Sequence, residues 1–306
     1  MIEVQNLKKN YLKGDKFAGI GKDAGLSFNV NVGEIFGVIG PDGSGKSTLF
    51  RILASLLLPD SGTALLGGLD VVNDYKYVRE IIGYMPGQFS LYQDLSVEEN
   101  LRFFATVFNT TIEENYHLIK DIYSHIEPFK TRKAGNLSGG MKQKLALSCA
   151  LIHKPQVLIL DEPTTGVDPV SRKEFWDMLG RLKNQDITII VSTAYMDEAS
   201  RCDRIALMQD GDFIALDSPT RIVDNYNQDI WAVQANNMSA SLKDLRNYKH
   251  VLSCFAFGDK HHITVDENFN PDYLHSYLNQ FGYSNILIER ITPTIEDCFL
   301  ALTNEQ

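Results

Sequence analysis

Nine consecutive residues match the pattern GxxxxGK[ST], which is suited to binding a polyphosphate. They are Gly40, Pro41, Asp42, Gly43, Ser44, Gly45, Lys46, Ser47 and Thr48. Glycines let backbone N–H groups converge on clustered negative charge without clashes from Cβ atoms. Lys46 supplies a cation for the β- and γ-phosphates, and the Ser47 hydroxyl is placed to bind Mg²⁺. The segment therefore predicts a site for a nucleoside triphosphate.

The elements expected around this segment support that prediction. Residues 34–39 form a short apolar run typical of a strand, and a helix is expected to begin near Lys46. Its buried stripe is Leu49, Ile52, Leu53, Leu56 and Leu57, and residues 59–62 (Pro-Asp-Ser-Gly) are expected to stop it. The N-terminus of such a helix favours an anion through its dipole. We therefore expect a strand, a glycine-rich turn and a helix in that order.

Two carboxylates follow a second apolar run. Residues 157–160 (Val-Leu-Ile-Leu) predict a buried strand, and Asp161 and Glu162 come directly after it. Open α/β sheets place ligands at the carboxyl ends of their strands. Asp161 suits a Mg²⁺ contact, and Glu162 suits a general base that polarises the attacking water. An acidic pair after a strand can also be a plain helix cap, and the phosphate loop upstream favours the catalytic interpretation.

A second small-residue turn lies at residues 137–143 (Leu-Ser-Gly-Gly-Met-Lys-Gln). Ser138, Gly139 and Gly140 open an expected helix and form another phosphate-sized notch with free N–H groups. Taken alone, this is also compatible with an ordinary N-capped helix. A single nucleotide site that already has a phosphate loop does not need a second phosphate-binding turn. The second turn has a function if it binds the nucleotide held by a partner chain.

Over roughly residues 1–220, the chain resembles the ATP-binding subunit of ABC transporters. The resemblance is carried by four motifs in this order along the chain: GPDGSGKST, LSGGMKQ, LILDEP and TTGVD. The bacterial drug-exporter-type branch is the most similar. The resemblance implies a P-loop NTPase fold of ABC type, the cofactors ATP and Mg²⁺, and a head-to-tail dimer. Each ATP would lie between Lys46 of one chain and Ser138, Gly139 and Gly140 of the other. The second chain is either another copy or a related subunit.

The resemblance also assigns residues outside the phosphate loop. Asp168 falls in the family's D-loop, and Tyr11 falls where an aromatic ring stacks on adenine, although ordinary core packing also explains Tyr11. Residues 84–101 look like the segment that meets a transmembrane permease. Residues 293–302 resemble the tail of drug-exporter subunits, and they also fit an amphipathic helix with Ile295, Phe299 and Leu302 inward.

Two positions depart from the family pattern. The family carries Gln directly after Met-Pro, where it approaches Mg²⁺ and the attacking water, whereas here Gly87 intervenes and Gln88 comes one place late. We keep Gln88 as a candidate metal and nucleotide contact. The family's switch-loop His is replaced by Ala194, whose methyl group donates no hydrogen bond. Losing a charge-assisted bond of about 1.5–3 kcal/mol predicts turnover slowed about tenfold to a hundredfold.

Composition limits the class of partner. The chain has 306 residues, with 29 Lys and Arg against 39 Asp and Glu and a net charge of −10, so nucleic acid is not an expected partner. The four cysteines form no CxxC pair, which fits free thiols in a reducing compartment. No secretory signal and no bilayer-length apolar run is evident. Together with these features, the resemblance implies a peripheral protein on the cytoplasmic face of the inner membrane, held there by its permease.

The remaining pattern predicts two domains. Residues 1–220 read as an α/β body with a helical subdomain at about 88–153, which opens with Ser96 and Glu99 in capping-box spacing. A helix capped by Asp168, a strand at 187–192 and a hairpin at 204–217 follow. Residues 221–306 read as a small α+β domain with the ferredoxin-like order βαββαβ. Its expected strands are 230–234, 251–257, 261–265 and 286–290, and its expected helices are 239–247 and 272–280.

Three other functions remain open. An importer ATPase would use residues 220–306 as a small-molecule-sensing domain. A weakly hydrolytic regulatory subunit would explain the departures at Gln88 and Ala194. An ABC-type ATPase acting on DNA or the ribosome would carry coiled-coil or zinc insertions or a second ATPase unit, and this sequence shows one set of motifs.

Overall fold

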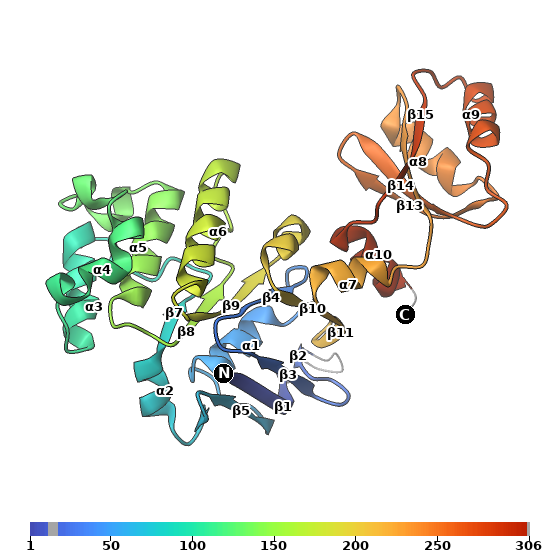
Figure 1. The fold of residues 1–306 in the computed structure, drawn as a ribbon. Helices are drawn as coiled ribbons and strands as arrows, with labels where there is room; N and C mark the ends of the chain where they lie inside the picture. Colours follow the sequence, from blue (N-terminus) through green and yellow to red (C-terminus); the bar gives the residue numbers. More distant parts are fainter. Residues whose placement is uncertain (12–17, 305–306) are drawn as a thin grey trace. The chain divides into compact units, whose positions relative to one another are not determined.

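A computed structural model describes residues 1–11 and 18–304 of the chain. The chain divides into two compact units, Met1–Pro219 and Thr220–Gln306 (Figure 1). Within the described residues, no helix has the length and apolar character that a bilayer span needs.

A six-stranded sheet in the order β11-β10-β4-β9-β8-β7 is the centre of the first unit. All of its neighbouring pairs are parallel except β10–β11. Its strands are β4 (Ile35–Ile39), β7 (Ile82–Met85), β8 (Val157–Asp161), β9 (Thr188–Thr193), β10 (Arg204–Gln209) and β11 (Asp212–Asp217). β4, β8 and β9 are buried along their whole length, which is typical of parallel strands covered on both faces. Their carboxyl ends meet at one edge of the sheet.

The strands predicted around the two motifs are confirmed within one residue at each end. The predicted hairpin is also present, and its turn is formed by Asp210 (φ 48°) and Gly211 (φ 92°). Positive φ at both central residues is the conformation of a type I′ turn. β7 was not predicted.

Helix α1 (Lys46–Leu53) follows β4. The expected extension of its buried stripe to Leu56 and Leu57 is wrong, because the helix ends at Leu53 and Leu56 is 56% exposed. Ser55 takes a left-handed conformation (φ 55°) that ends the helix before the proline is reached.

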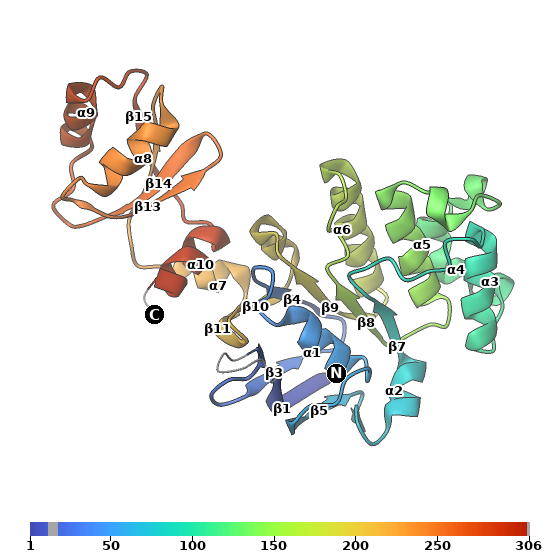
Figure 2. The same ribbon diagram turned by 180° about the vertical axis from the view of Figure 1, so that it is seen from behind.

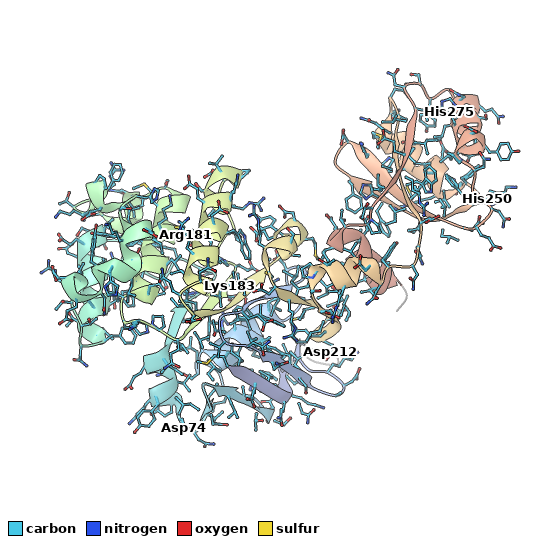
Figure 3. All side chains as sticks on the ribbon, viewed as in Figure 1. Asp74, Arg181, Lys183, Asp212, His250 and His275 are labelled. Atoms are coloured by element: carbon cyan, nitrogen blue, oxygen red, sulfur yellow. The ribbon has the colours of Figure 1, made fainter. Side chains whose placement is uncertain are left out.

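Helix α6 (Pro169–Lys183) precedes β9, and the short 3₁₀ helix η3 (Met196–Arg201) follows that strand. Asp168 caps α6 as predicted, by accepting a hydrogen bond from the Ser171 N–H at 3.0 Å. At the other end of α6, Lys183 pairs with Asp203 at 2.5 Å (Figure 3). A cation in the last helical turn also suits the negative end of the helix dipole.

An antiparallel sheet covers one side of α1, and the sequence analysis did not predict it. It is built from β1 (Ile2–Asn10), β2 (Gly19–Ile20), β3 (Leu26–Val30), β5 (Ser61–Leu66) and β6 (Leu69–Asp70), and α2 (Tyr75–Ile81) leads from it to β7. Ile2 and Val4 of β1 share one buried cluster with Phe36 of β4 and Leu49 of α1. The two sheets therefore enclose α1 and hold its first turn in place.

Helices form the segment between β7 and β8, as predicted. They are α3 (Val97–Val107), α4 (Ile112–Tyr123), η1 (Glu127–Phe129), η2 (Ala134–Asn136) and α5 (Gly139–Leu151). The capping box predicted at Ser96 and Glu99 is present, and Thr111 and Glu114 form another at α4. These two capping boxes stabilise the first turns of α3 and α4, the helices that pack beside α5.

The second unit (Figure 2) begins in α7 (Pro219–Asp224). It contains a four-stranded antiparallel sheet in the order β13-β14-β12-β15. Its elements are β12 (Ile230–Gln234), α8 (Met238–Arg246), β13 (Val251–Phe257), β14 (Lys260–Val265), α9 (Pro271–Gln280) and β15 (Leu287–Ile291). This is the order βαββαβ, with both helices contributing to one buried cluster against the sheet. His250 (Figure 3) lies between α8 and β13, and Asp266 directly follows β14. His250 Nδ1 lies 3.0 Å from Asp266 Oδ2.

The exporter-like tail forms α10 (Ile295–Asn304). Asp297 accepts a hydrogen bond from the Thr294 N–H at 2.8 Å and lies 2.8 Å from His262 Nδ1 on β14. Burial raises the pKa of Asp297, but the hydrogen bonds from His262 and Thr294 outweigh burial and hold this pKa below its ordinary value. Ile295 and Phe299 are buried, as the amphipathic pattern predicted. The tail motif therefore fixes α10 to the second sheet.

Candidate functional site

The glycine-rich loop at residues 40–45 joins β4 to α1, as predicted. Gly43 (φ 82°) and Gly45 (φ 110°) hold left-handed conformations that only glycine adopts without strain. A Cβ atom on Gly40 would lie 2.2 Å from the Met208 carbonyl oxygen, whereas a Cβ on Gly43 would meet no atom within 4 Å. One side of the loop therefore packs on β10, and the side at Gly43 is open to a ligand.

Buried polar groups in this loop suit an anion. The Ser44 hydroxyl is buried and, in the part of the chain that the structure describes, has no hydrogen-bond partner. The Lys46 side chain is 3% exposed, and its Nζ donates to the carbonyl oxygens of Gly40 (2.8 Å) and Pro41 (3.0 Å). A buried polar donor without an acceptor costs about 1–3 kcal/mol, which phosphate oxygens would recover. The loop therefore fits the polyphosphate that its sequence predicted.

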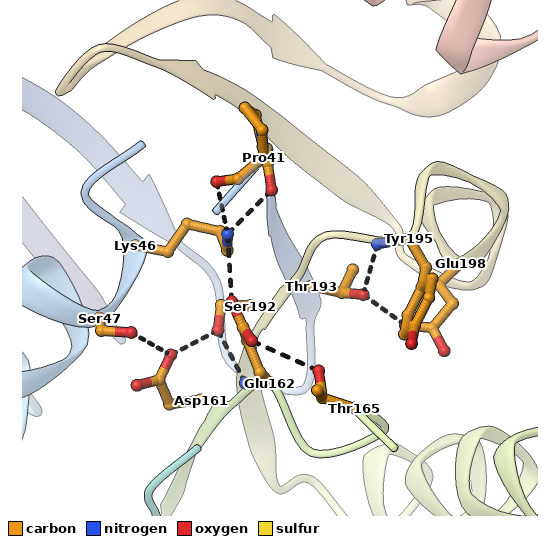
Figure 4. A network of polar contacts seen from close by, with 11 residues as sticks. Pro41, Lys46, Ser47, Asp161, Glu162, Thr165, Ser192, Thr193, Tyr195 and Glu198 are labelled. Carbon is orange, nitrogen blue, oxygen red and sulfur yellow. Dashed lines mark hydrogen bonds and ion pairs between the residues drawn. The ribbon is translucent and has the colours of Figure 1, made fainter. Parts of the chain in front are cut away.

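Asp161 at the end of β8 reaches the phosphate loop. Its Oδ1 accepts hydrogen bonds from the Ser47 hydroxyl at 3.1 Å and from the Ser192 hydroxyl at 2.7 Å (Figure 4). Ser47 and Asp161 are 114 residues apart in sequence, and the parallel order of β4, β9 and β8 brings them together. Hydroxyl and carboxylate oxygens are the donors that Mg²⁺ takes in nucleotide sites.

Glu162 takes a left-handed backbone conformation (φ 48°) that is uncommon for a residue other than glycine. Its N–H donates to the Ser192 hydroxyl at 2.9 Å, which holds this conformation in place. Glu162 Oε1 lies 3.2 Å from Lys46 Nζ, and Glu162 Oε2 accepts a hydrogen bond from the Thr165 hydroxyl at 3.3 Å (Figure 4). The strained backbone directs this carboxylate at the phosphate loop.

The switch loop, residues 192–195, lies at the end of β9. The Thr193 hydroxyl donates to Glu198 Oε2 at 2.6 Å and accepts from the Tyr195 N–H at 3.0 Å. Ala194 lies between these anchored residues and is partly exposed. The backbone of the loop is therefore held on both sides of the position where the family has a histidine.

Tyr11 lies beside the first turn of α1. The Thr48 hydroxyl donates to Tyr11 Oη at 3.4 Å, and the Tyr11 side chain is partly buried. Tyr11 therefore lies next to the turn of α1 that follows the predicted phosphate loop.

The signature turn (residues 137–143, the second small-residue turn) opens α5, where the Ser138 hydroxyl accepts a hydrogen bond from the Met141 N–H at 3.4 Å. A Cβ on Gly139 would lie 3.3 Å from the Gly166 carbonyl oxygen, and a Cβ on Gly140 would lie 2.8 Å from Ser171 Oγ. The turn is therefore packed against the D-loop and the start of α6. Among the described residues, no hydrogen bond or ion pair joins it to the phosphate loop of the same chain.

Asp168, at the start of α6, is held by its capping role. Hydrogen bonds from Ser171 lower the pKa of Asp168, which keeps the carboxylate ionised beside the signature turn. An ionised carboxylate at the N-cap also suits the positive end of the helix dipole.

Gln88 makes no contact with Asp161, the predicted Mg²⁺ ligand, among the hydrogen bonds of the described residues. A Cβ on Gly87 would lie 3.8 Å from Asp161 Oδ2, so position 87 is the one that faces Asp161. The Gln88 side chain is exposed and lines a groove described below. In the described residues, no hydrogen bond joins Gln88 to Ser47 or Asp161.

Sequence reasoning missed Ser192, which bonds both Asp161 and the backbone of Glu162. It also missed Thr165, which bonds the Glu162 carboxylate. The signal for Ser192 was present, because it is a polar residue at the end of a predicted strand whose preceding residues 189–191 are apolar. The contacts of Ser192 depend on the pairing of β9 with β8, which the sequence alone does not specify.

Comparisons with known proteins agree with this geometry. A family model described as "ABC transporter" matches residues 24–165. The chain is 36% identical over 307 residues to the "Probable multidrug ABC transporter ATP-binding protein YbhF" of Escherichia coli (strain K12), covering 99% of this chain and 52% of that protein. It is 34% identical over 319 residues to the "Nod factor export ATP-binding protein I" of Burkholderia orbicola (strain AU 1054), covering 100% of this chain and 97% of that protein. The chain thus spans about half the length of the first relative and nearly all of the second.

Solved structures show the same fold. An ATP-binding subunit of an ABC transporter superimposes with a TM-score of 0.65 at 26% identity, covering 74% of this chain and 93% of that one. A dimeric ATP-binding cassette in a post-hydrolysis state, bound to ADP and Pi, superimposes with a TM-score of 0.63 at 26% identity, covering 71% and 98% of the two chains. The chain belongs to the ABC transporter family, among its ATP-binding proteins.

Proposed function

We propose that this chain binds and hydrolyses ATP as the motor subunit of a membrane exporter. The convergence of Lys46, Ser47, Asp161 and Glu162 at one edge of the central sheet carries the proposal. The names of the relatives, which are multidrug and Nod factor export ATP-binding proteins, support export. The test is Mg²⁺-dependent phosphate release from ATP by the purified chain, alone and together with its permease.

Ser47 and Asp161 are the proposed Mg²⁺ ligands, because their oxygens already face one another across 3.1 Å. Gln88 joins them only if the loop at residues 86–88 moves, since Gly87 holds the place next to Asp161. When bound, Mg²⁺ neutralises charge on the β- and γ-phosphates.

Lys46 and Glu162 have complementary tasks in the proposed reaction. Lys46 lies 3.2 Å from Glu162 Oε1, and a triphosphate in the loop competes for this ammonium. Once Lys46 binds phosphate oxygens, Glu162 loses its cation and becomes a better acceptor for the proton of the attacking water. The loop 40–45 and the Ser44 hydroxyl orient the phosphates during this step.

A second chain completes the site in this proposal. Ser138, Gly139 and Gly140 present the start of α5 to the nucleotide held by the phosphate loop of the partner, with two ATP molecules between the two chains. The packing of Gly140 on Ser171 links this turn to α6 and Asp168. Tyr11 is the proposed adenine contact. The partner is a second copy or a related subunit.

We propose that the permease docks in a groove of about 660 Å³ between β7 and the helices α3 and α5. Its lining is mostly apolar and includes Leu56, Tyr84, Pro86, Phe89, Phe104 and Phe108. Burial, followed by the negative charge of Asp161, raises the pKa of Tyr84 to about 12, so the groove borders the metal-binding carboxylate. A permease element in the groove would place this chain on the cytoplasmic face of the membrane.

Replacing Leu56 with glutamate is expected to abolish co-purification with the permease and to leave ATP hydrolysis by the isolated chain unchanged. Leu56 lines the groove and is 56% exposed, so the charge disturbs a partner and not the core. Leu58→Glu is the matched control, because Leu58 is 65% exposed and does not line the groove. Equal permease binding by both variants would place the docking surface elsewhere.

Replacing Ala194 with histidine is expected to raise kcat for ATP about tenfold to a hundredfold, because the imidazole supplies a charge-assisted hydrogen bond of about 1.5–3 kcal/mol. The anchored backbone at Thr193 and Tyr195 holds the new side chain at the family position. Steady-state phosphate release measures the change. Ser200→His, on an exposed position of η3, is the control. An unchanged kcat in Ala194→His would show that Ala194 does not limit turnover.

The cavity beside α10 in the second unit does not favour the importer alternative. The cavity between α10 and its sheet measures about 10 Å³, close to the volume of one water probe. A sensing domain needs room for an amino acid or a similar effector.

A further inference from the structure

The carboxylate of Glu198, at the second position after Met196 in η3, is 4% exposed and lies among polar groups of three other elements. Its Oε2 accepts a hydrogen bond from the Thr193 hydroxyl at 2.6 Å (Figure 4). The same oxygen accepts a hydrogen bond from the Thr164 hydroxyl at 3.0 Å. Its Oε1 has no hydrogen-bond partner in the described residues and lies 3.9 Å from Arg172 Nη1 on α6. A buried carboxylate is costly unless it is paired and hydrogen-bonded.

Each partner of Glu198 belongs to a segment that ends at the catalytic site. Thr193 precedes Ala194 and follows Ser192, whose hydroxyl holds Asp161 and the N–H of Glu162. Thr164 lies two residues after Glu162. A shift of Glu198 would therefore move the end of β9 and the segment after β8 together.

Arg172, the third partner of Glu198, connects Glu198 and its two threonines to the surface proposed to face the second chain. Arg172 follows Ser171, whose N–H donates to the Asp168 carboxylate and whose side chain packs on Gly140 of the signature turn. The Arg172 guanidinium also stacks 4.3 Å from the centre of the Tyr195 ring, in the switch loop. Glu198 thus joins the switch loop, the segment that carries Glu162 and the start of α6.

We propose that Glu198 is a positioning residue for ATP hydrolysis: it holds the switch loop against the segment after Glu162, so that the general base and the backbone at Ala194 keep their places at the γ-phosphate. The inference rests on the proposed function. Because Ala194 supplies no side-chain hydrogen bond, the placement of this loop depends on the contacts of Thr193 and Tyr195 with Glu198 and Arg172.

Three variants test the proposal through kcat and KM for Mg-ATP, nucleotide affinity and Tm. Glu198→Ala removes both hydroxyl acceptors and is expected to lower kcat about tenfold to a hundredfold, since small misplacements of catalytic groups have effects of this size. Glu198→Gln keeps an oxygen for the two threonines and is expected to recover a large part of the lost kcat. Thr164→Val removes one hydrogen bond at nearly constant shape and is expected to give a smaller loss. KM and nucleotide affinity stay near the wild-type values in all three.

Asp197→Ala is the matched control, because Asp197 is the exposed neighbour of Glu198 and lies 3.6 Å from the same arginine. It is expected to keep the wild-type kcat. A folded Glu198→Ala protein with wild-type kcat would overturn the proposal. If Glu198→Ala does not fold, a wild-type kcat in both Glu198→Gln and Thr164→Val would overturn it.

Variants of the phosphate site separate this proposal from the proposed function. Loss of hydrolysis in Lys46→Met and Glu162→Gln, together with full hydrolysis in the Glu198 variants, would reject only the positioning role. A chain that hydrolyses no ATP in any form would reject the proposed function itself.

Discussion

Replacing Glu162 with glutamine is expected to lower kcat for ATP by about 10²–10⁴-fold, the range that general base catalysis contributes. The amide is nearly isosteric and keeps an oxygen for the Thr165 hydroxyl, so the left-handed backbone and the Ser192 hydrogen bond remain. Nucleotide affinity is expected to stay the same or to rise, because Lys46 no longer pairs with a carboxylate. Single-turnover phosphate release and equilibrium binding of Mg-ATP measure the two effects separately.

Glu174→Gln is the control for this variant. Glu174 is an exposed glutamate that pairs with Lys144 at 2.8 Å, away from the phosphate loop. Exposed pairs of this kind contribute about 0–1 kcal/mol, so both kcat and nucleotide affinity should match wild type. Hydrolysis by Glu162→Gln at the wild-type rate would show that another group accepts the proton.

Replacing Lys46 with methionine is expected to weaken Mg-ATP binding about tenfold to a hundredfold. The side chain keeps its length and loses the ammonium, whose charge-assisted hydrogen bonds to phosphate are worth about 1.5–3 kcal/mol. Glu162 also loses its cation and is left closer to the negative charge of the nucleotide. A fluorescent ATP analogue titrated into both proteins measures the change in Kd.

Lys243→Met on α8 controls for removal of a positive charge, because Lys243 is exposed in the second unit. Tm of both variants is compared with wild type, since Lys46 is buried and its loss leaves the carbonyl oxygens of Gly40 and Pro41 without their donor. A folded Lys46→Met protein with wild-type affinity would contradict the assignment of the phosphate loop.

Local sequence was sufficient to predict the phosphate loop and its flanking elements. The loop is contiguous, and the backbone angles at Gly43 and Gly45 are a direct consequence of residue type. The approach of Asp161 to Ser47 was also predictable in outline, because parallel strands end at a common edge. The caps at Ser96 and Asp168 are side chains that accept hydrogen bonds from N–H groups three residues later, and both caps are present.

Features that depend on long-range pairing were not predictable from one sequence. The pairing of β1 with β3 and β5 joins segments far apart along the chain, and no local pattern specifies which strand lies next to which. The role of Ser192 depends on the β8–β9 register in the same way. The early end of α1 arises from the left-handed Ser55, a residue type that carries no strong stop signal.

Two carboxylates, Glu162 and Glu198, show what a sequence motif identifies and what only the assembled structure shows. Glu162 was identified because it belongs to a contiguous motif. Glu198 lies in no such motif, and its importance follows from its hydroxyl partners on β9 and after β8. Contacts of this kind appear only when the sheet is assembled.

The most direct test of the account is the rate of Mg²⁺-dependent phosphate release from ATP, measured on the wild-type chain, Glu162→Gln and Lys46→Met under identical conditions. We predict saturable release by the wild type, tight Mg-ATP binding with almost no release by Glu162→Gln, and weakened binding by Lys46→Met. Wild-type protein that retains Mg-ATP but never cleaves it, or equal rates in all three proteins, would contradict a hydrolytic site at the carboxyl ends of β4 and β8.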